Sequence, residues 1–316
     1  MKNCPYCGAE ISGDVKFCTV CGAPLHETQS NTPSINTLPA VESRAASVGV
    51  ALIKSVCFML YFFGVQLIIT MVYMFAVMAN NISEIAFGDL DVIYELIGVR
   101  LHETMILSGL LTVLILGLIY ALRKRKLSDE ISLKPVPPFS LVKVAICSVA
   151  FQFAVAIGLS FIPVPEAMYE ALETTSKLLM GGSAVMQIIN IAIITPIVEE
   201  VIFRGFIYSK MRTVMPPLVA AIISGAMFGF VHGNIIAFVY ATLLGIFMAM
   251  LFEKYNSIIP AIMCHIVFNG ASLLTAFIPD NNVVLLTIFF ISAVTLGLCM
   301  IWIFRSNNGQ NTNKEE

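Results

Sequence analysis

The chain has 316 residues, of which 58% are hydrophobic and 12% are charged, and its formal net charge is −2. Soluble domains contain roughly 45–50% apolar and about 25% charged residues, so this composition excludes an ordinary soluble protein. The sequence has no basic patch interleaved with aromatic residues, so no nucleic-acid partner is expected. We therefore expect an all-α polytopic membrane protein whose main surroundings are the lipid bilayer.

The first residues contain two Cys-x-x-Cys pairs, each followed by a glycine. Four thiolates at this spacing can bind one Zn²⁺ tetrahedrally, and the glycines suit the tight turns of two knuckles. Two disulfides are the alternative, and they would need an oxidising compartment. Residues 3–25 resemble the short zinc ribbons at the N-termini of many bacterial and archaeal membrane proteins, so we expect a zinc-ribbon domain over residues 1–25. The resemblance implies a structural zinc ion bound by Cys4, Cys7, Cys18 and Cys21.

Residues 26–47 are polar and lack periodicity, which predicts a disordered tether. The following part, residues 48–306, alternates apolar runs of about 18 residues or longer with short polar breaks, a pattern typical of membrane spans. A polar tail, residues 307–316, ends the chain. The apolar runs predict about eight transmembrane helices, at 51–78, 102–122, 141–163, 185–206, 217–233, 235–252, 257–277 and 283–304.

Lys and Arg residues in short loops indicate the cytosolic side of a membrane protein. They follow the second, fourth, sixth and eighth predicted spans, whereas the connection 80–101 is acidic. An even number of spans with this bias predicts that both termini lie in the cytosol, beneath the cytoplasmic (plasma) membrane. The cytosol is reducing, which favours zinc over disulfides at the N-terminal cysteines. The basic residues are Arg123-Lys124-Arg125-Lys126, Lys210, Arg212, Lys254 and Arg305.

Three ionisable residues, Glu199, Glu200 and Arg204, interrupt a nearly continuous apolar stretch over residues 185–207. Each costs roughly 2.5–3.5 kcal/mol near the centre of a bilayer unless it is paired or lines a wet cavity. Residues four apart share a helix face, so Glu200 and Arg204 are predicted to form an ion pair. Glu199 lies about 100° around the helix and stays available as a base. The alternative is a helix end whose charges are solvated among lipid headgroups.

Two histidines lie in later spans, in the patterns Phe228-x-x-x-His232 and His265-x-x-x-Asn269. Histidine is rare inside membrane spans and indicates function there, although a single histidine can also be a buried residue bonded to a carbonyl. His102 is expected to be interfacial. The predicted topology places His232 far from Glu199 and His265, so it requires either a short, tilted fifth span or a turn sunk into the protein.

Small residues recur every four positions at 225–233 and at 241–249, in the fifth and sixth predicted spans. Such rows let membrane helices approach closely, although glycine is common in membrane helices in any case. Pro196 precedes the carboxylates and leaves the Ala192 carbonyl without its helical donor. We expect it to kink the fourth span and help to open a cavity there.

Taken in order on separate helices, Glu-Glu-x-x-x-Arg, Phe-x-x-x-His and His-x-x-x-Asn resemble the motifs of the CPBP intramembrane proteases. These proteases are relatives of the CAAX prenyl endopeptidase and of the bacteriocin-processing or Abi proteins. The resemblance covers residues 185–275 and implies an intramembrane (metallo)endopeptidase that cuts a membrane-associated peptide or protein. It also implies an active site made of Glu199, Glu200, Arg204, His232, His265 and Asn269.

Hydrolysis of an amide needs an activated water and donors for the tetrahedral oxyanion. Glu199, together with His232, can bind and deprotonate the water, while His265 and Asn269 can donate hydrogen bonds to the oxyanion. Glu200 and Arg204 would hold the helix geometry. Two histidines and one glutamate are also a workable catalytic zinc shell, so the sequence leaves open whether a metal takes part.

Two other functions fit the same residues. A non-catalytic membrane scaffold or immunity protein could keep the fold and the motifs without turnover. A transporter could use the buried carboxylates as a proton relay, although the two halves of the chain show no internal repeat of the polar segments. In each case the zinc ribbon is expected to be an accessory that docks a protein partner or substrate.

Overall fold

The computed structural model describes residues 2–3, 10–11, 40–82, 90–163, 165 and 181–305. The chain divides into two compact units, Met1–Ser43 and Arg44–Glu316. In the first unit, strands β1 (Lys2–Asn3) and β2 (Glu10–Ile11) pair in antiparallel register, with Lys2 opposite Ile11. The four N-terminal cysteines lie outside the described residues, as does most of the segment predicted to be a tether.

From Ala40 onward the described chain is helical, which confirms the predicted all-α class. Helix α1 begins at Ala40, so the last residues of the segment predicted to be a tether are helical. One continuous helix over residues 184–212 is built from α7 (Ala184–Gln187), η1 (Ile188–Ile194), α8 (Thr195–Glu200), η2 (Val201–Tyr208) and α9 (Ser209–Arg212). The other helices are α1 (Ala40–Asn80), α3 (Leu90–Leu122), α4 (Leu127–Glu130), α5 (Pro138–Ser160), α10 (Pro217–Phe230), α11 (Ile235–Tyr255), α12 (Ile259–Ser272), the short η3 (Thr275–Phe277) and α13 (Asn282–Arg305).

Within the described residues, seven helices are long and apolar enough to cross a membrane. The prediction of eight spans is therefore corrected in one place. The fifth predicted span, 217–233, is helix α10, which has 14 residues. At 1.5 Å per residue it is about 21 Å long, shorter than the ~30 Å hydrocarbon core. It ends early because Gly233 turns the chain with a positive φ of 80° and Asn234 caps the next helix.

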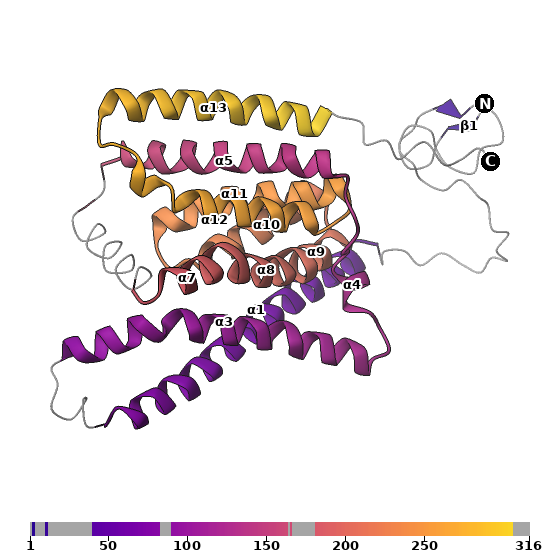
Figure 1. Cartoon of the computed structure of the whole chain (residues 1–316). Helices are drawn as coiled ribbons and strands as arrows, with labels where there is room; N and C mark the ends of the chain where they lie inside the picture. Colours follow the sequence, from indigo (N-terminus) through magenta and orange to yellow (C-terminus); the bar gives the residue numbers. More distant parts are fainter. Residues whose placement is uncertain are drawn as a thin grey trace. The chain divides into compact units, whose positions relative to one another are not determined.

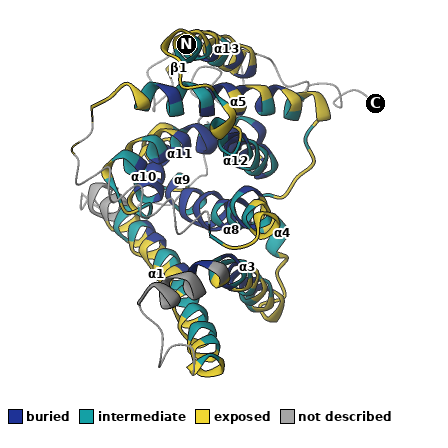
Figure 2. Ribbon diagram, turned by 60° about the vertical axis from the view of Figure 1, so that its left-hand side comes forward, coloured by how far each residue is buried: buried dark blue, intermediate teal, exposed yellow. Residues whose placement is uncertain are grey.

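The helix of residues 184–212 lies between two groups of helices in the second unit (Figure 1). Helices α1 and α3 lie on one side of it, and α10, α11 and α12 lie on the other, with α5 and α13 beyond α12. Buried side chains concentrate around η2 and in the middle of α11, whereas α1 and α13 expose many apolar side chains (Figure 2). Phe75 and Phe290, for example, are 76% and 61% exposed. Exposed apolar faces of this size fit helices that contact lipid.

Helices α10 and α11 pack closely through glycines, as the rows of small residues predicted. A Cβ atom on Gly229 would lie 2.2 Å from Thr242 Oγ1, and one on Gly245 would lie 2.9 Å from the Cα of Gly225. No larger residue fits at these positions without movement of the backbone. Gly233 does not share this role, since a Cβ there would meet nothing within 4 Å.

The basic loop segments meet at one end of the helices. Lys210 forms an ion pair with Glu130, and Arg212 Nη2 lies 2.9 Å from Glu253 Oε1. These contacts join the loop after the second span to the ends of the helix of residues 184–212 and of α11. The basic segments after the second, fourth and sixth predicted spans therefore lie close to one another.

Candidate active site

The polar site is organised by the helix of residues 184–212, which contains two π-helical stretches separated by a short α-helical one. The seven residues of η1 and the eight residues of η2 are π-helical, and the short α8 between them carries Glu199 and Glu200. Pro196, at the start of α8, has no N–H to donate, which fits a change of winding at this position. Wide π turns are rare and occur frequently at functional sites.

Glu200 and Arg204 form a sealed ion pair beneath the helix surface. Arg204 Nη1 donates to Glu200 Oε1 at 2.6 Å, and Arg204 Nη2 donates to the carbonyl oxygen of Gly245 at 3.1 Å. His265 Nδ1 lies 2.9 Å from the same Glu200 Oε1, to which it donates. Glu200, Arg204 and His265 are at most 2% exposed. We call these three residues the sealed cluster.

Phe228 packs at the centre of the site. The Arg204 guanidinium carbon lies 4.6 Å from the centroid of the Phe228 ring, in a cation–π geometry. The rings of His232 and His265 lie 4.8 and 5.6 Å from it, in edge-to-face arrangement. In the sequence, Phe228 stands out only as the first residue of a motif, and its packing against Arg204 and the two histidines was not predicted. Its spacing of four residues before His232 was the available signal.

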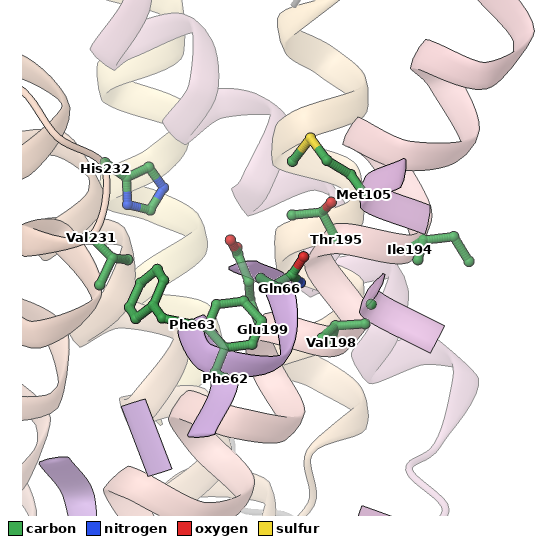
Figure 3. Close-up of a pocket in the computed structure, with 11 residues that line it drawn as sticks. Phe62, Phe63, Gln66, Met105, Ile194, Thr195, Val198, Glu199, Val231 and His232 are labelled. Atoms are coloured by element: carbon green, nitrogen blue, oxygen red, sulfur yellow. The ribbon is translucent and has the colours of Figure 1, made fainter. Parts of the chain in front are cut away.

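Glu199 and His232 instead line a pocket of about 250 Å³ (Figure 3). The Glu199 side chain is 14% exposed, and the remaining walls come from α1, α3, the helix of residues 184–212 and Val231, which follows α10. Adjacent residues of one helix thus have opposite environments, with Glu199 open to a pocket and Glu200 sealed. We call this second group the open pocket.

Histidine geometry links the two groups. His265 Nε2 lies 3.7 Å from Glu199 Oε2, which is beyond hydrogen-bond distance, so His265 stands between the two carboxylates. His232 Nδ1 lies 2.8 Å from the Phe228 carbonyl oxygen and donates to it, so a neutral His232 ring presents the lone pair of Nε2.

The predicted topology places His232 far from Glu199, but the short helix α10 brings the two residues close together. Both residues line the same pocket. The chain turns at Gly233, before α10 has covered the depth of a bilayer core. A backbone break at such a depth is tolerated where it lines a cavity, and Val231 and His232 do line one.

Asn269 holds helices together in this arrangement. Its Nδ2 donates to the carbonyl oxygen of Ile191 at 3.0 Å, which ties α12 to η1. Of the six residues that the sequence analysis singled out, Glu199 and His232 line the pocket and three form the sealed cluster behind them. Asn269 keeps one further hydrogen on Nδ2 for another acceptor.

His102, which the sequence predicts to be interfacial, is buried among the described helices. His102 is 0% exposed, and its Nδ1 lies 3.1 Å from Nδ2 of the equally buried Asn190. Asn190 Oδ1 in turn accepts from Thr195 Oγ1 at 3.0 Å, and Thr195 lines the pocket. The reason is that α3 begins at Leu90, so His102 lies well inside the helix and faces η1.

Within the residues that the structure describes, no three His, Cys, Asp or Glu side chains are grouped so that they could hold a metal ion. In the positions that they occupy here, Glu199, His232 and His265 do not form such a group. The chemistry considered below uses only the side chains themselves.

Fold and site together define an integral membrane protein with a carboxylate–histidine site among its spanning helices. Residues 181–271 match the Rce1-like type II CAAX prenyl endopeptidases, and residues 3–25 match the zinc-ribbon domain. The chain therefore combines an Rce1-like CAAX protease family domain with an N-terminal zinc-ribbon domain, which confirms the resemblance seen in the motifs. It has no significant match among curated proteins or among solved structures.

Proposed function

We propose that the protein is an intramembrane endopeptidase that hydrolyses a peptide bond of a membrane-associated peptide or protein. The observation that carries this proposal is the division between two neighbouring carboxylates. Glu200 is bound by Arg204 and His265, whereas Glu199 faces a pocket that it shares with His232. A free carboxylate beside an imidazole in a confined pocket is the arrangement that general base catalysis requires.

In the proposed reaction, Glu199 and His232 Nε2 bind a water molecule, and Glu199 takes one of its protons. The resulting hydroxide attacks the carbonyl carbon of the substrate and forms a tetrahedral oxyanion. Collapse of this intermediate breaks the carbon–nitrogen bond, and Glu199 returns the proton to the leaving amine. The apolar walls limit the access of bulk water, which strengthens each electrostatic interaction in the pocket.

Oxyanion stabilisation falls to His265 and Asn269 in this proposal. His265 Nδ1 is already committed to Glu200, so the ring can donate from Nε2 when both nitrogens carry a proton. The carboxylates of Glu199 and Glu200 lie on either side of the His265 ring. Asn269 would use the Nδ2 hydrogen that Ile191 does not take.

A substitution at Glu199 tests this mechanism. Replacing Glu199 with Gln keeps the shape of the pocket and removes the base, so we expect cleavage to fall by about 10²–10⁴-fold. The measurement compares membrane and secreted peptide termini in cells that carry wild type, a deletion or Glu199→Gln. Glu103→Gln is the matched control, since that carboxylate pairs with Arg100 and Tyr73 away from the pocket.

Each alternative function has its own outcome in this experiment. If Glu199→Gln complements a deletion phenotype and changes no terminus, the protein is a non-catalytic scaffold or immunity protein. If the substitution instead abolishes a proton-coupled flux and leaves every terminus unchanged, the transporter reading is correct.

We further propose that Cys4, Cys7, Cys18 and Cys21 bind a structural zinc ion and that both termini face the cytosol. The zinc-ribbon match supports the first statement, and the closeness of these basic segments to one another supports the second. Zinc measured on the purified full-length protein should be one ion per chain and should be lost in Cys18→Ser but retained in Cys57→Ser. An equal zinc content in both variants would contradict the assignment.

A further inference from the structure

The pocket has a second wall that the Rce1-like match does not include. Phe62, Phe63 and Gln66 of α1 and Met105 and Gly109 of α3 line it, and all five precede the matched residues 181–271. Figure 3 shows Phe62, Phe63, Gln66 and Met105 around the same pocket as Glu199 and His232. We call these five residues the α1–α3 wall. The family match therefore says nothing about the side chains of this wall.

Gln66 is the only side chain of the α1–α3 wall that carries a primary amide. Ser108 Oγ lies within hydrogen-bond reach of Gln66 Oε1 and, at 3.0 Å, of the Met105 carbonyl oxygen, and Gln66 Nε2 makes no hydrogen bond within the described residues. An amide group costs free energy in an apolar span unless its donors find acceptors. Gln66 is partly exposed to the pocket, so Nε2 can serve an acceptor that enters from outside.

We propose that the α1–α3 wall is a substrate subsite, an inference that rests on the proposed peptidase function. Gln66 Nε2 donates to a backbone carbonyl of the substrate, while Phe62, Phe63 and Met105 contact an apolar side chain next to the scissile bond. An extended peptide that enters a water-poor pocket must have its carbonyl groups satisfied by the protein, and Gln66 supplies one donor.

The size and charge of the pocket restrict this side chain. A volume of about 250 Å³ is below the ~300–1,000 Å³ of clefts that enclose drug-sized ligands, so the pocket holds about one side chain beside the bond. Among the described residues, Glu199 and His232 are the only ionisable ones that line it, and the proposed reaction uses both. A charged side chain of the substrate would find no partner there, so the subsite favours an aliphatic or other uncharged apolar residue.

The test uses the full-length protein reconstituted in lipid vesicles, together with apolar peptides from a tryptic digest of membrane proteins that are incorporated in the same vesicles. The residues on both sides of each cleaved bond are counted, and kcat and KM are measured for the best-cleaved peptide. We expect Gln66→Leu to raise KM about three- to tenfold, the loss of one hydrogen bond, with kcat within about twofold. Phe63→Ala should shift the preferred residue beside the bond toward larger apolar side chains.

Leu67→Ala is the matched control on the same helix, because Leu67 is 61% exposed and does not line the pocket. It should leave KM and the residue preference unchanged. A shared loss of unfolding stability in Gln66→Leu and Ser108→Ala, with wild-type KM in both, would mean that Gln66 only joins α1 to α3. That outcome overturns the subsite.

The outcomes also separate the subsite from the function on which it rests. If Glu199→Gln abolishes cleavage but Gln66→Leu and Phe63→Ala retain the wild-type KM and residue preference, the subsite is wrong and the peptidase stands. If wild type and Glu199→Gln leave the peptides equally uncut, the peptidase function fails and the subsite fails with it.

Discussion

The sealed cluster and the open pocket begin at adjacent residues and differ in almost every physical respect. In the sealed cluster, Glu200 accepts bonds from Arg204 and His265 and is 0% exposed. In the open pocket, Glu199 has a 14% exposed side chain and stands 3.7 Å from His265 Nε2. The sealed cluster therefore mainly holds the helices together, with His265 also assigned to the proposed reaction, and the open pocket carries the proposed base. Of the two consecutive glutamates, Glu200 stabilises the helix packing and Glu199 is the proposed base.

The largest effect is expected from a substitution of Arg204 in the sealed cluster. Replacing Arg204 with Met leaves the Glu200 carboxylate buried without its guanidinium partner, and we expect a loss of about 3–5 kcal/mol in the free energy of unfolding. Unfolding by SDS in mixed micelles measures this change.

Arg212→Met is the matched control, since its pair with Glu253 is formed by side chains that are 39% and 31% exposed. Partly exposed pairs contribute about 0–1 kcal/mol, so the control should lose far less stability. Equal losses in the two variants would show that burial does not distinguish the pairs.

A smaller effect is expected from Gly245, which lets α10 and α11 approach and whose carbonyl accepts from Arg204. In Gly245→Ala the new Cβ would lie 2.9 Å from Gly225 Cα and 3.2 Å from Arg204 Nη2. Overpacking of this kind costs about 1–3 kcal/mol of unfolding free energy, measured by the same SDS titration. Gly297→Ala is the control, because a Cβ there meets nothing within 4 Å, and it should be neutral or slightly stabilising. Wild-type stability in Gly245→Ala would refute the close contact.

The smallest effect is expected at the hydrogen bonds that hold α3 against η1. Asn190→Ala removes the contacts of this amide with His102 and Thr195. Interhelical hydrogen bonds in membrane proteins contribute about 0.6 kcal/mol on average, with about 1–2 kcal/mol at the upper end. We expect a loss in that range, together with a weaker substrate affinity because Thr195 and Met105 shape the pocket. Ser55→Ala, which removes a bond within one helix, is the control for the change in affinity.

Spacing along one helix predicted the contacts that are local. The pair Glu200–Arg204 lies four residues apart, and the small residues of α10 and α11 repeat every four residues, so helical geometry alone brings each set to one face. The error in the number of spans also has a local cause. Hydropathy cannot tell a full span from a shorter helix that ends at a turn such as Gly233, because both are equally apolar.

The sequence by itself determined the membrane class, the sealed ion pair and the order of the three motifs. Composition and apolar runs define the class, and helical periodicity relates residues only a few positions apart. Only the tertiary structure decided that His232 shares a pocket with Glu199, that His265 stands between two carboxylates, and that His102 is buried against Asn190. The α1–α3 wall also became visible only there, because Gln66 and Glu199 come from helices far apart in the chain. Contacts between distant helices depend on packing, and no local periodicity encodes them.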